Sequence, residues 1–131
     1  MKVTVLMENT SPDCLLHEHG LSLHLSYEGH SVLLDAGSSG RFTENAAALG
    51  VDLSAVEKAA LSHGHWDHAD GLAAFFARNA AAPVYARPAA LLPRYREKDG
   101  SYDGVSPALI EQFRSRFDLA DGCLLYTSRC V

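Results

Sequence analysis

Short runs of apolar residues near the N-terminus predict three strands. Residues 2–6 (KVTVL) are β-branched and apolar, residues 21–25 (LSLHL) alternate with a period of two, and residues 31–34 (SVLL) form a continuous apolar run. These patterns are typical of β-strands. Residues 28–30 (EGH) separate the second run from the third by a short polar connection. We therefore predict a hairpin from these two strands.

Helical spacing of apolar residues follows in three segments. It predicts helices over residues 42–49 and 71–79, and Gly50 stands where the first of them is expected to stop. Ser106 and Pro107 open a last helix, which is expected to bury Leu109, Ile110, Phe113 and Phe117.

Shorter features complete the pattern. Residues 58–61 and 83–86 read as brief buried strands, and Ser54 with Glu57 fits a capping box for one helical turn. Residues 94–106 are polar, aromatic and glycine-containing, so we expect a loop there. Strands that come first and then alternate with helices predict an α/β protein with helices covering a mixed sheet.

Composition and charge narrow the function. The chain has 131 residues, enough for one domain, and a formal net charge of −5, which disfavours nucleic-acid binding. It contains no apolar run long enough for a membrane span and no secretory leader pattern, so we expect a cytoplasmic protein without a membrane partner.

The segment His63–His68 (HGHWDH) carries the candidate chemistry. It places three imidazoles and a carboxylate in six residues at the expected end of a strand. Neutral imidazole and carboxylate suit Zn²⁺, and imidazole also suits iron. Alternation along a loop pairs His63 with His65, while Asp67 and His68 can turn toward a second position. The alternative is an exposed histidine cluster that binds metal only adventitiously.

This segment resembles the HxHxDH signature of the metallo-β-lactamase superfamily. LLDAG at residues 33–37 resembles the family strand that ends in an aspartate supporting the metal ligands, which would be Asp35. Residues 8–25 and 83–107 resemble one branch of the superfamily, related to the dihydropterin–ribofuranosylaminobenzene phosphate synthase of methanopterin biosynthesis.

The resemblance implies an αββα sandwich with a dinuclear site for two Zn²⁺ ions, or iron or manganese, about 3.5–4 Å apart. His63 and His65 would bind the first metal, and Asp67 and His68 the second, with Asp67 also serving as the catalytic residue. The implied enzyme is a metallo-hydrolase that attacks a small-molecule substrate with a metal-bound hydroxide. A pterin-type transferase, whose metals orient a diphosphate leaving group, is the alternative.

The chain also departs from the family. The superfamily supplies a third ligand to each metal from its later part, but no histidine follows His68 here. We therefore expect residues 1–122 to be the N-terminal half of the sandwich, with one sheet face exposed. As written, the chain is expected to bind metal weakly and to be inactive, and a non-catalytic metal-binding fragment is the remaining alternative.

The last residues, 123–131 (CLLYTSRCV), do not continue the sequence pattern that precedes them. They resemble the translated mosaic end of a sequencing-library transposon followed by the start of its reverse complement. We expect them to be an artefact tail, to be left out of fold reasoning. Without the tail, Cys14 is the one remaining cysteine, which is expected to be a free thiol.

A few further residues are candidates for contact with substrate. His19 precedes the predicted hairpin, and Arg94 belongs to a small basic and aromatic patch with Tyr95, Arg96 and Lys98. Trp66, between the candidate ligands, is expected either to pack against the site or to line its opening. Asp70 is expected at a helix start. Residues 37–40 (GSSG) are expected to be a helix-entry loop rather than a phosphate cradle.

Overall fold

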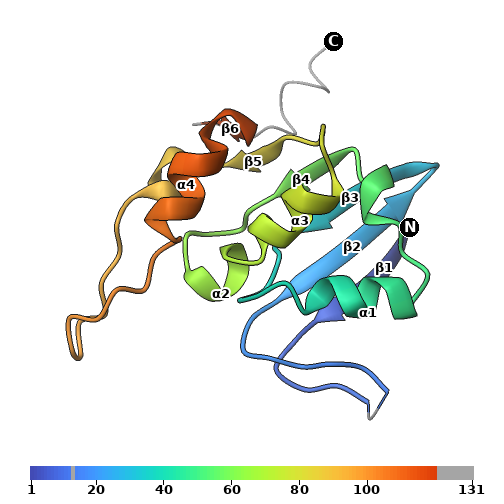
Figure 1. The fold of residues 1–131 in the computed structure, drawn as a ribbon, viewed down its shortest axis with the longest axis horizontal. Helices are drawn as coiled ribbons and strands as arrows, with labels where there is room; N and C mark the ends of the chain where they lie inside the picture. Colours follow the sequence, from blue (N-terminus) through green and yellow to red (C-terminus); the bar gives the residue numbers. More distant parts are fainter. Residues whose placement is uncertain (13, 121–131) are drawn as a thin grey trace.

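A computed structural model describes residues 1–12 and 14–120 of the chain. They form a six-stranded sheet whose spatial order follows the sequence, from β1 at one edge to β6 at the other (Figure 1). The strands are β1 (Lys2–Met7), β2 (Ser22–Tyr27), β3 (His30–Leu34), β4 (Lys58–Ala60), β5 (Val84–Ala86) and β6 (Phe117–Leu119).

The sheet changes direction at β3. The strands β1, β2 and β3 pair antiparallel, and β3, β4, β5 and β6 pair parallel. Parallel strands bring their carboxyl ends to one edge of a sheet, where α/β proteins place their ligands. Asp35 directly follows β3, and residues 61–68 follow β4. The topology therefore carries both segments to the same edge.

The helices lie on one face of the sheet (Figure 1). The α-helices are α1 (Phe42–Ala48), α2 (Trp66–Ala69), α3 (Leu72–Arg78) and α4 (Pro107–Phe113), and the 3₁₀ turns are η1 (Leu53–Ala55), η2 (Pro88–Leu91) and η3 (Arg114–Arg116). Among the described residues no helix is long and apolar enough to cross a membrane.

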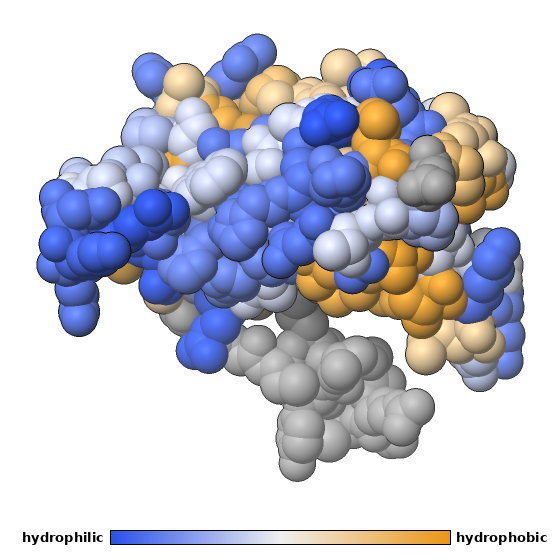
Figure 2. All heavy atoms as spheres, turned by 90° about the horizontal axis from the view of Figure 1, so that it is seen from below, coloured by the Kyte–Doolittle hydropathy of each residue, from blue (hydrophilic) through white to orange (hydrophobic). Residues whose placement is uncertain are grey.

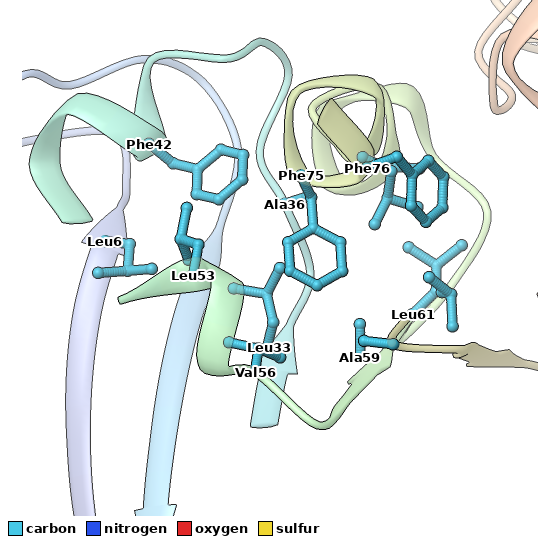
Figure 3. Close-up of a cluster of buried hydrophobic side chains, with 14 of the residues drawn as sticks. Leu6, Leu33, Ala36, Phe42, Leu53, Val56, Ala59, Leu61, Phe75 and Phe76 are labelled. Carbon is cyan, nitrogen blue, oxygen red and sulfur yellow. The ribbon is translucent and has the colours of Figure 1, made fainter. Parts of the chain in front are cut away.

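The core fills the space between the sheet and α1 and α3. Leu33 from β3 and Ala59 from β4 face Phe42 and Phe75 from the helices, and all four are almost fully buried (Figure 3). Phe76 extends this core toward α4, with its ring centroid 4.5 Å from that of Phe113. Phe42, Phe75 and Phe76, from two of the segments predicted as helices, therefore pack against the sheet.

The opposite face of the sheet is apolar and partly open. Its cross-strand neighbours form two rows over three strands, Val3–Leu25–Val32 and Val5–Leu23–Leu34. Val3 and Val5 are 49% and 45% exposed. Seen from below, hydrophilic residues surround the loop at residues 94–106, at the left, and hydrophobic residues gather toward the side of β1 and β2 (Figure 2).

The α/β prediction is confirmed, but three local predictions are wrong. Phe117 begins the edge strand β6 instead of continuing the last helix. The turn at η1 is capped by Asp52, whose carboxylate accepts a hydrogen bond from the Ser54 amide at 2.9 Å, instead of by the expected capping box. Asp70 ends α2 instead of starting a helix. The expected artefact tail at residues 123–131 lies outside the described residues, and Cys14 is free and exposed.

Candidate metal centre

The segment after β4 is fixed to its surroundings through its backbone. His65 caps the N-terminus of the short helix α2, which begins at Trp66. Gly64 packs directly on the 3₁₀ turn η2, so closely that a Cβ atom there would lie 1.9 Å from the Ala90 carbonyl oxygen. Only glycine allows this approach. Because Gly64 lies between His63 and His65 in the chain, the contact fixes the backbone that carries both histidines.

Asp35 is the buried centre of a hydrogen-bond network. Its Oδ1 accepts a hydrogen bond from the Ser62 amide at 2.8 Å. Its Oδ2 lies 2.6 Å from the Ser62 hydroxyl, which donates to it, and 2.8 Å from His68 Nδ1. The carboxyl side chain is 1% exposed. His68 therefore donates from Nδ1 and keeps Nε2 as an acceptor for a metal, which is the usual way a carboxylate orients a metal-binding histidine.

His63 and His65 direct one nitrogen each toward a shared point. His63 Nε2 lies 3.1 Å from His65 Nδ1, while the other nitrogen of His63, Nδ1, is 2.9 Å from the Ser62 hydroxyl. Two ligands of a tetrahedral zinc with bonds of about 2.0–2.1 Å are separated by about 3.3 Å. The distance between these two nitrogens therefore fits shared coordination of one metal.

Burial lowers the pKa of His63, and charge on His68 and His65 would lower it further. A metal binds only the neutral form of imidazole, so the surroundings of His63 favour the protonation state that coordination requires.

Asp67 and His68 form a second pair. Asp67 Oδ2 is 3.6 Å from His68 Nε2 and 3.2 Å from His19 Nε2. His19 is 68% exposed on its side chain and, with Glu8, Asp67 and His68, lines a cavity of about 290 Å³. The sequence placed His19 near substrate, and the structure brings it to the opening beside this pair.

The donor set fits a metal. One ligand atom each from Asp35, His63 and His68 lie within 4.8 Å of one another. Both oxygens of Asp35 are already engaged by Ser62 and His68, so we assign Asp35 to orientation and leave the histidine nitrogens for coordination. Imidazole nitrogens with a nearby carboxylate are the ligands that Zn²⁺ and iron take in proteins.

Asp103 was missed by the sequence reasoning. Its Oδ1 accepts hydrogen bonds from Trp66 Nε1 at 3.1 Å and from Arg96 Nε at 3.1 Å, and its Oδ2 lies 3.9 Å from His65 Nε2. The hydrogen bond from Arg96 holds the pKa of Asp103 below its usual range. Asp103 therefore presents a carboxylate to the nitrogen of His65 that does not face His63.

Of the basic and aromatic patch around Arg94, only part contacts the candidate site. Arg96 pairs with Asp103, with Nη2 3.0 Å from Oδ1. Arg94 is exposed, and it takes part through its backbone, where its carbonyl accepts a hydrogen bond from the Asp103 amide at 2.9 Å. A substrate contact by the Arg94 side chain stays a prediction.

Replacing Asp103 by asparagine is expected to weaken zinc binding about tenfold. Asparagine keeps the shape but removes the negative charge that lies 3.9 Å from His65 Nε2, and carboxylates beside a ligating histidine contribute about 10–100-fold in metal affinity. Competition with a chromophoric chelator measures the effect. Asp99→Asn is the matched control, because Asp99 is an exposed residue of the same loop that contacts Ser101. Equal affinity of Asp103→Asn and wild type would contradict the assigned role.

Comparison with known proteins decides the family. A family profile described as "Metallo-beta-lactamase superfamily" matches residues 20–123, which include the whole segment from Asp35 to His68. The chain belongs to the metallo-beta-lactamase superfamily. The matched range includes residues 63–68, and their assignment as the HxHxDH signature stays a prediction. The particular branch suggested by residues 8–25 and 83–107 stays a prediction.

Individual relatives agree with the superfamily. The structure of Tm1679, described as a metal-dependent hydrolase of the beta-lactamase superfamily, matches with a TM-score of 0.65 and 27% identity, covering 92% of this chain and 41% of Tm1679. The Rm3 metallo-beta-lactamase matches with a TM-score of 0.53 and 27% identity, covering 76% of this chain and 38% of Rm3.

The uncharacterized protein MJ0448 of Methanocaldococcus jannaschii is 26% identical over 118 residues, covering 89% of this chain and 45% of MJ0448. The chain thus spans less than half the length of Tm1679, Rm3 and MJ0448.

Proposed function

We propose that the chain forms the metal-binding part of a zinc-dependent hydrolase that acts on a small molecule. The observation that carries this proposal is the convergence of His63 Nε2 and His65 Nδ1 to 3.1 Å, beside the Asp67–His68 pair. The match to Tm1679, described as a metal-dependent hydrolase, supports it. Because the ligands are nitrogen and oxygen atoms, zinc is the metal we propose, with iron or manganese as substitutes.

Each of the four ligands has a stated place in this proposal. His63 and His65 hold the first metal, and Asp67 and His68 hold the second. When bound, such a metal acts as a Lewis acid and lowers the pKa of water to about 7. Asp67 is the residue proposed to touch the reacting atoms, because its Oδ2 faces both His68 and the open cavity beside His19.

The remaining residues position these ligands. Asp35 fixes the ring of His68 from the buried side, and Ser62 links Asp35 to His63 by a single hydroxyl. Asp103 faces His65 from the opposite side. Asp35 and Ser62 thus fix the rings of His68 and His63 by hydrogen bonds, so we expect little reorganisation of these two rings when a metal enters.

The number of ligands sets the expected strength of binding. The sequence offers two ligands for each metal within residues 63–68, whereas a catalytic zinc usually has three protein ligands. We therefore propose that the 131-residue chain binds zinc weakly and has no turnover, and that a complete enzyme supplies one further ligand to each metal.

Zinc titration of the purified chain, with turnover of a phosphodiester and an ester measured in parallel, tests this proposal. We expect weak binding that His65→Ala abolishes and no turnover above zinc-matched buffer. His24→Ala is the matched control, because His24 lies on β2 and contacts Ser31 at 2.7 Å, away from the candidate ligands. Binding unaffected by His65→Ala would refute the metal centre. Tight binding of two metals together with turnover would refute the proposal that each metal lacks one ligand in this chain.

A further inference from the structure

A second cavity lies next to the metal centre and is larger than the one beside His19. It has a volume of about 480 Å³ and lies between α2 and the loop at residues 94–106, at the start of α4. Trp66, Asp70, Arg96 and Tyr102 contribute to its lining. Trp66 stands between the candidate ligands His65 and Asp67 in the chain, so the cavity adjoins the segment that carries them, although none of the four candidate ligands lines it.

The loop that closes this cavity is tied to the metal centre. Gly104, another lining residue, forms a β-bridge with His65. In Figure 1 the loop leaves the body of the domain beside α2 and α4. A molecule bound here would lie directly against residues that flank the proposed metal ligands.

Most polar groups of the lining are already engaged. Trp66 Nε1 and the Arg96 guanidinium donate to Asp103, and the Tyr102 hydroxyl donates to the Val105 carbonyl at 2.7 Å. Asp70 differs, because its Oδ1 accepts a hydrogen bond from the Ser106 amide at 2.9 Å while its Oδ2 accepts none from the described residues. The cavity therefore offers an unused carboxylate oxygen.

The walls and the charge define the ligand. Trp66 and Tyr102 contribute aromatic surface, and Tyr102 is held by an edge-on contact with Tyr95, with ring centroids 5.4 Å apart. Asp70 gives the lining a negative charge, and the positive charge of Arg96 is balanced by its ion pair with Asp103, which does not itself line the cavity. A cavity of this volume is in the range of small-molecule sites, about 300–1,000 Å³. An aromatic group with N–H donors fits the aromatic walls, the negative charge of Asp70 and the volume. An anionic group would instead be repelled by Asp70.

We propose that this cavity binds a planar aromatic group bearing N–H donors, with Asp70 Oδ2 as their acceptor, as the part of the substrate that lies beside the metal centre. The assignment to a substrate rests on the proposed hydrolase function. The binding site itself is a property of α2 and the loop and requires no metal.

Benzamidine is a suitable probe because it combines an aromatic ring with cationic N–H donors. Trp66 is the single tryptophan of the chain, so its fluorescence reports binding in this cavity directly. Titration is done in the presence of a chelator to remove metal. We expect saturable quenching, weakened about ten- to hundredfold by Asp70→Asn, since the probe loses a hydrogen bond to a charged group. Asp118→Asn, on β6 and exposed, is the matched control and should leave the affinity unchanged.

A comparison within the wild-type chain needs no variant. Benzoate has the same ring but no N–H donors and the opposite charge, and we expect it to bind at least about tenfold more weakly. Equal binding of benzamidine and benzoate, or equal affinity of Asp70→Asn and wild type, would overturn the proposed cavity site and leave the metal centre standing. Zinc binding unaffected by His65→Ala, with benzamidine binding intact, would overturn the hydrolase proposal instead.

Discussion

Replacing Asp35 by alanine is expected to destabilise the fold by about 3 kcal/mol and to weaken zinc binding about ten- to hundredfold. The side chain is 1% exposed and receives hydrogen bonds from the Ser62 amide, the Ser62 hydroxyl and His68 Nδ1. In the alanine variant these three donors lose their acceptor while they remain buried. Domains of this size have total stabilities of about 5–15 kcal/mol, so the loss is a large fraction.

Urea unfolding in the presence of a chelator measures the change in the free energy of unfolding without a contribution from bound zinc. Asp35→Asn keeps the shape and one acceptor, so it tests the orienting role if the alanine variant is too unstable to purify. Its amide group would face His68 Nδ1 with another donor, which disfavours the tautomer that leaves Nε2 free. Asp118→Ala, on the exposed edge strand β6, is the control for removing an aspartate. Zinc affinity unchanged in Asp35→Asn would contradict the assigned role.

Gly64→Ala is the second change with a large expected effect. The added Cβ would lie 1.9 Å from the Ala90 carbonyl oxygen and 2.7 Å from the Ala90 carbonyl carbon. Both atoms belong to the backbone of η2, so relief requires the segment carrying His63 and His65 to move away from the turn. Overpacking of this kind costs about 3 kcal/mol, and the displaced segment loses the convergence of the two histidines.

Thermal unfolding and zinc titration of Gly64→Ala check both consequences. Gly40→Ala is the matched control, since its Cβ would meet only the Ala74 methyl group, at 3.0 Å, which is a side-chain atom. We expect a smaller loss of stability there and unchanged zinc binding. A Gly64→Ala protein as stable as Gly40→Ala, with wild-type zinc affinity, would show that the close packing on η2 does not position the site.

The sequence alone points to the candidate metal centre because the proposed ligands are adjacent in the chain. His63, His65, Asp67 and His68 occupy six consecutive positions, and Asp35 ends an apolar run that already predicted a strand. The parallel pairing of β3 with β4 then brings the two segments together. This one strand pairing is the only long-range contact that is needed to bring Asp35 beside residues 63–68.

The residues that sequence reasoning missed depend on contacts between distant segments. Asp103 reaches Trp66 across 37 positions, and Asp70 reaches the Ser106 amide across 36. Both contacts exist because the loop at residues 94–106 returns to α2, and a polar loop carries no periodic pattern that fixes its path. Phe117 was assigned to a helix because one apolar residue fits a helical stripe and a short strand equally well.

The segment from His63 to His68 is proposed to bind metal through His63 Nε2, His65 Nδ1, the Asp67 carboxylate and His68 Nε2. Diffraction from crystals grown with zinc, measured on both sides of the zinc absorption edge, tests it most directly. We expect an anomalous peak about 2.0–2.1 Å from both His63 Nε2 and His65 Nδ1, with a second peak beside Asp67 and His68 Nε2. Zinc bound elsewhere in the crystal, with no peak between His63 and His65, would contradict it.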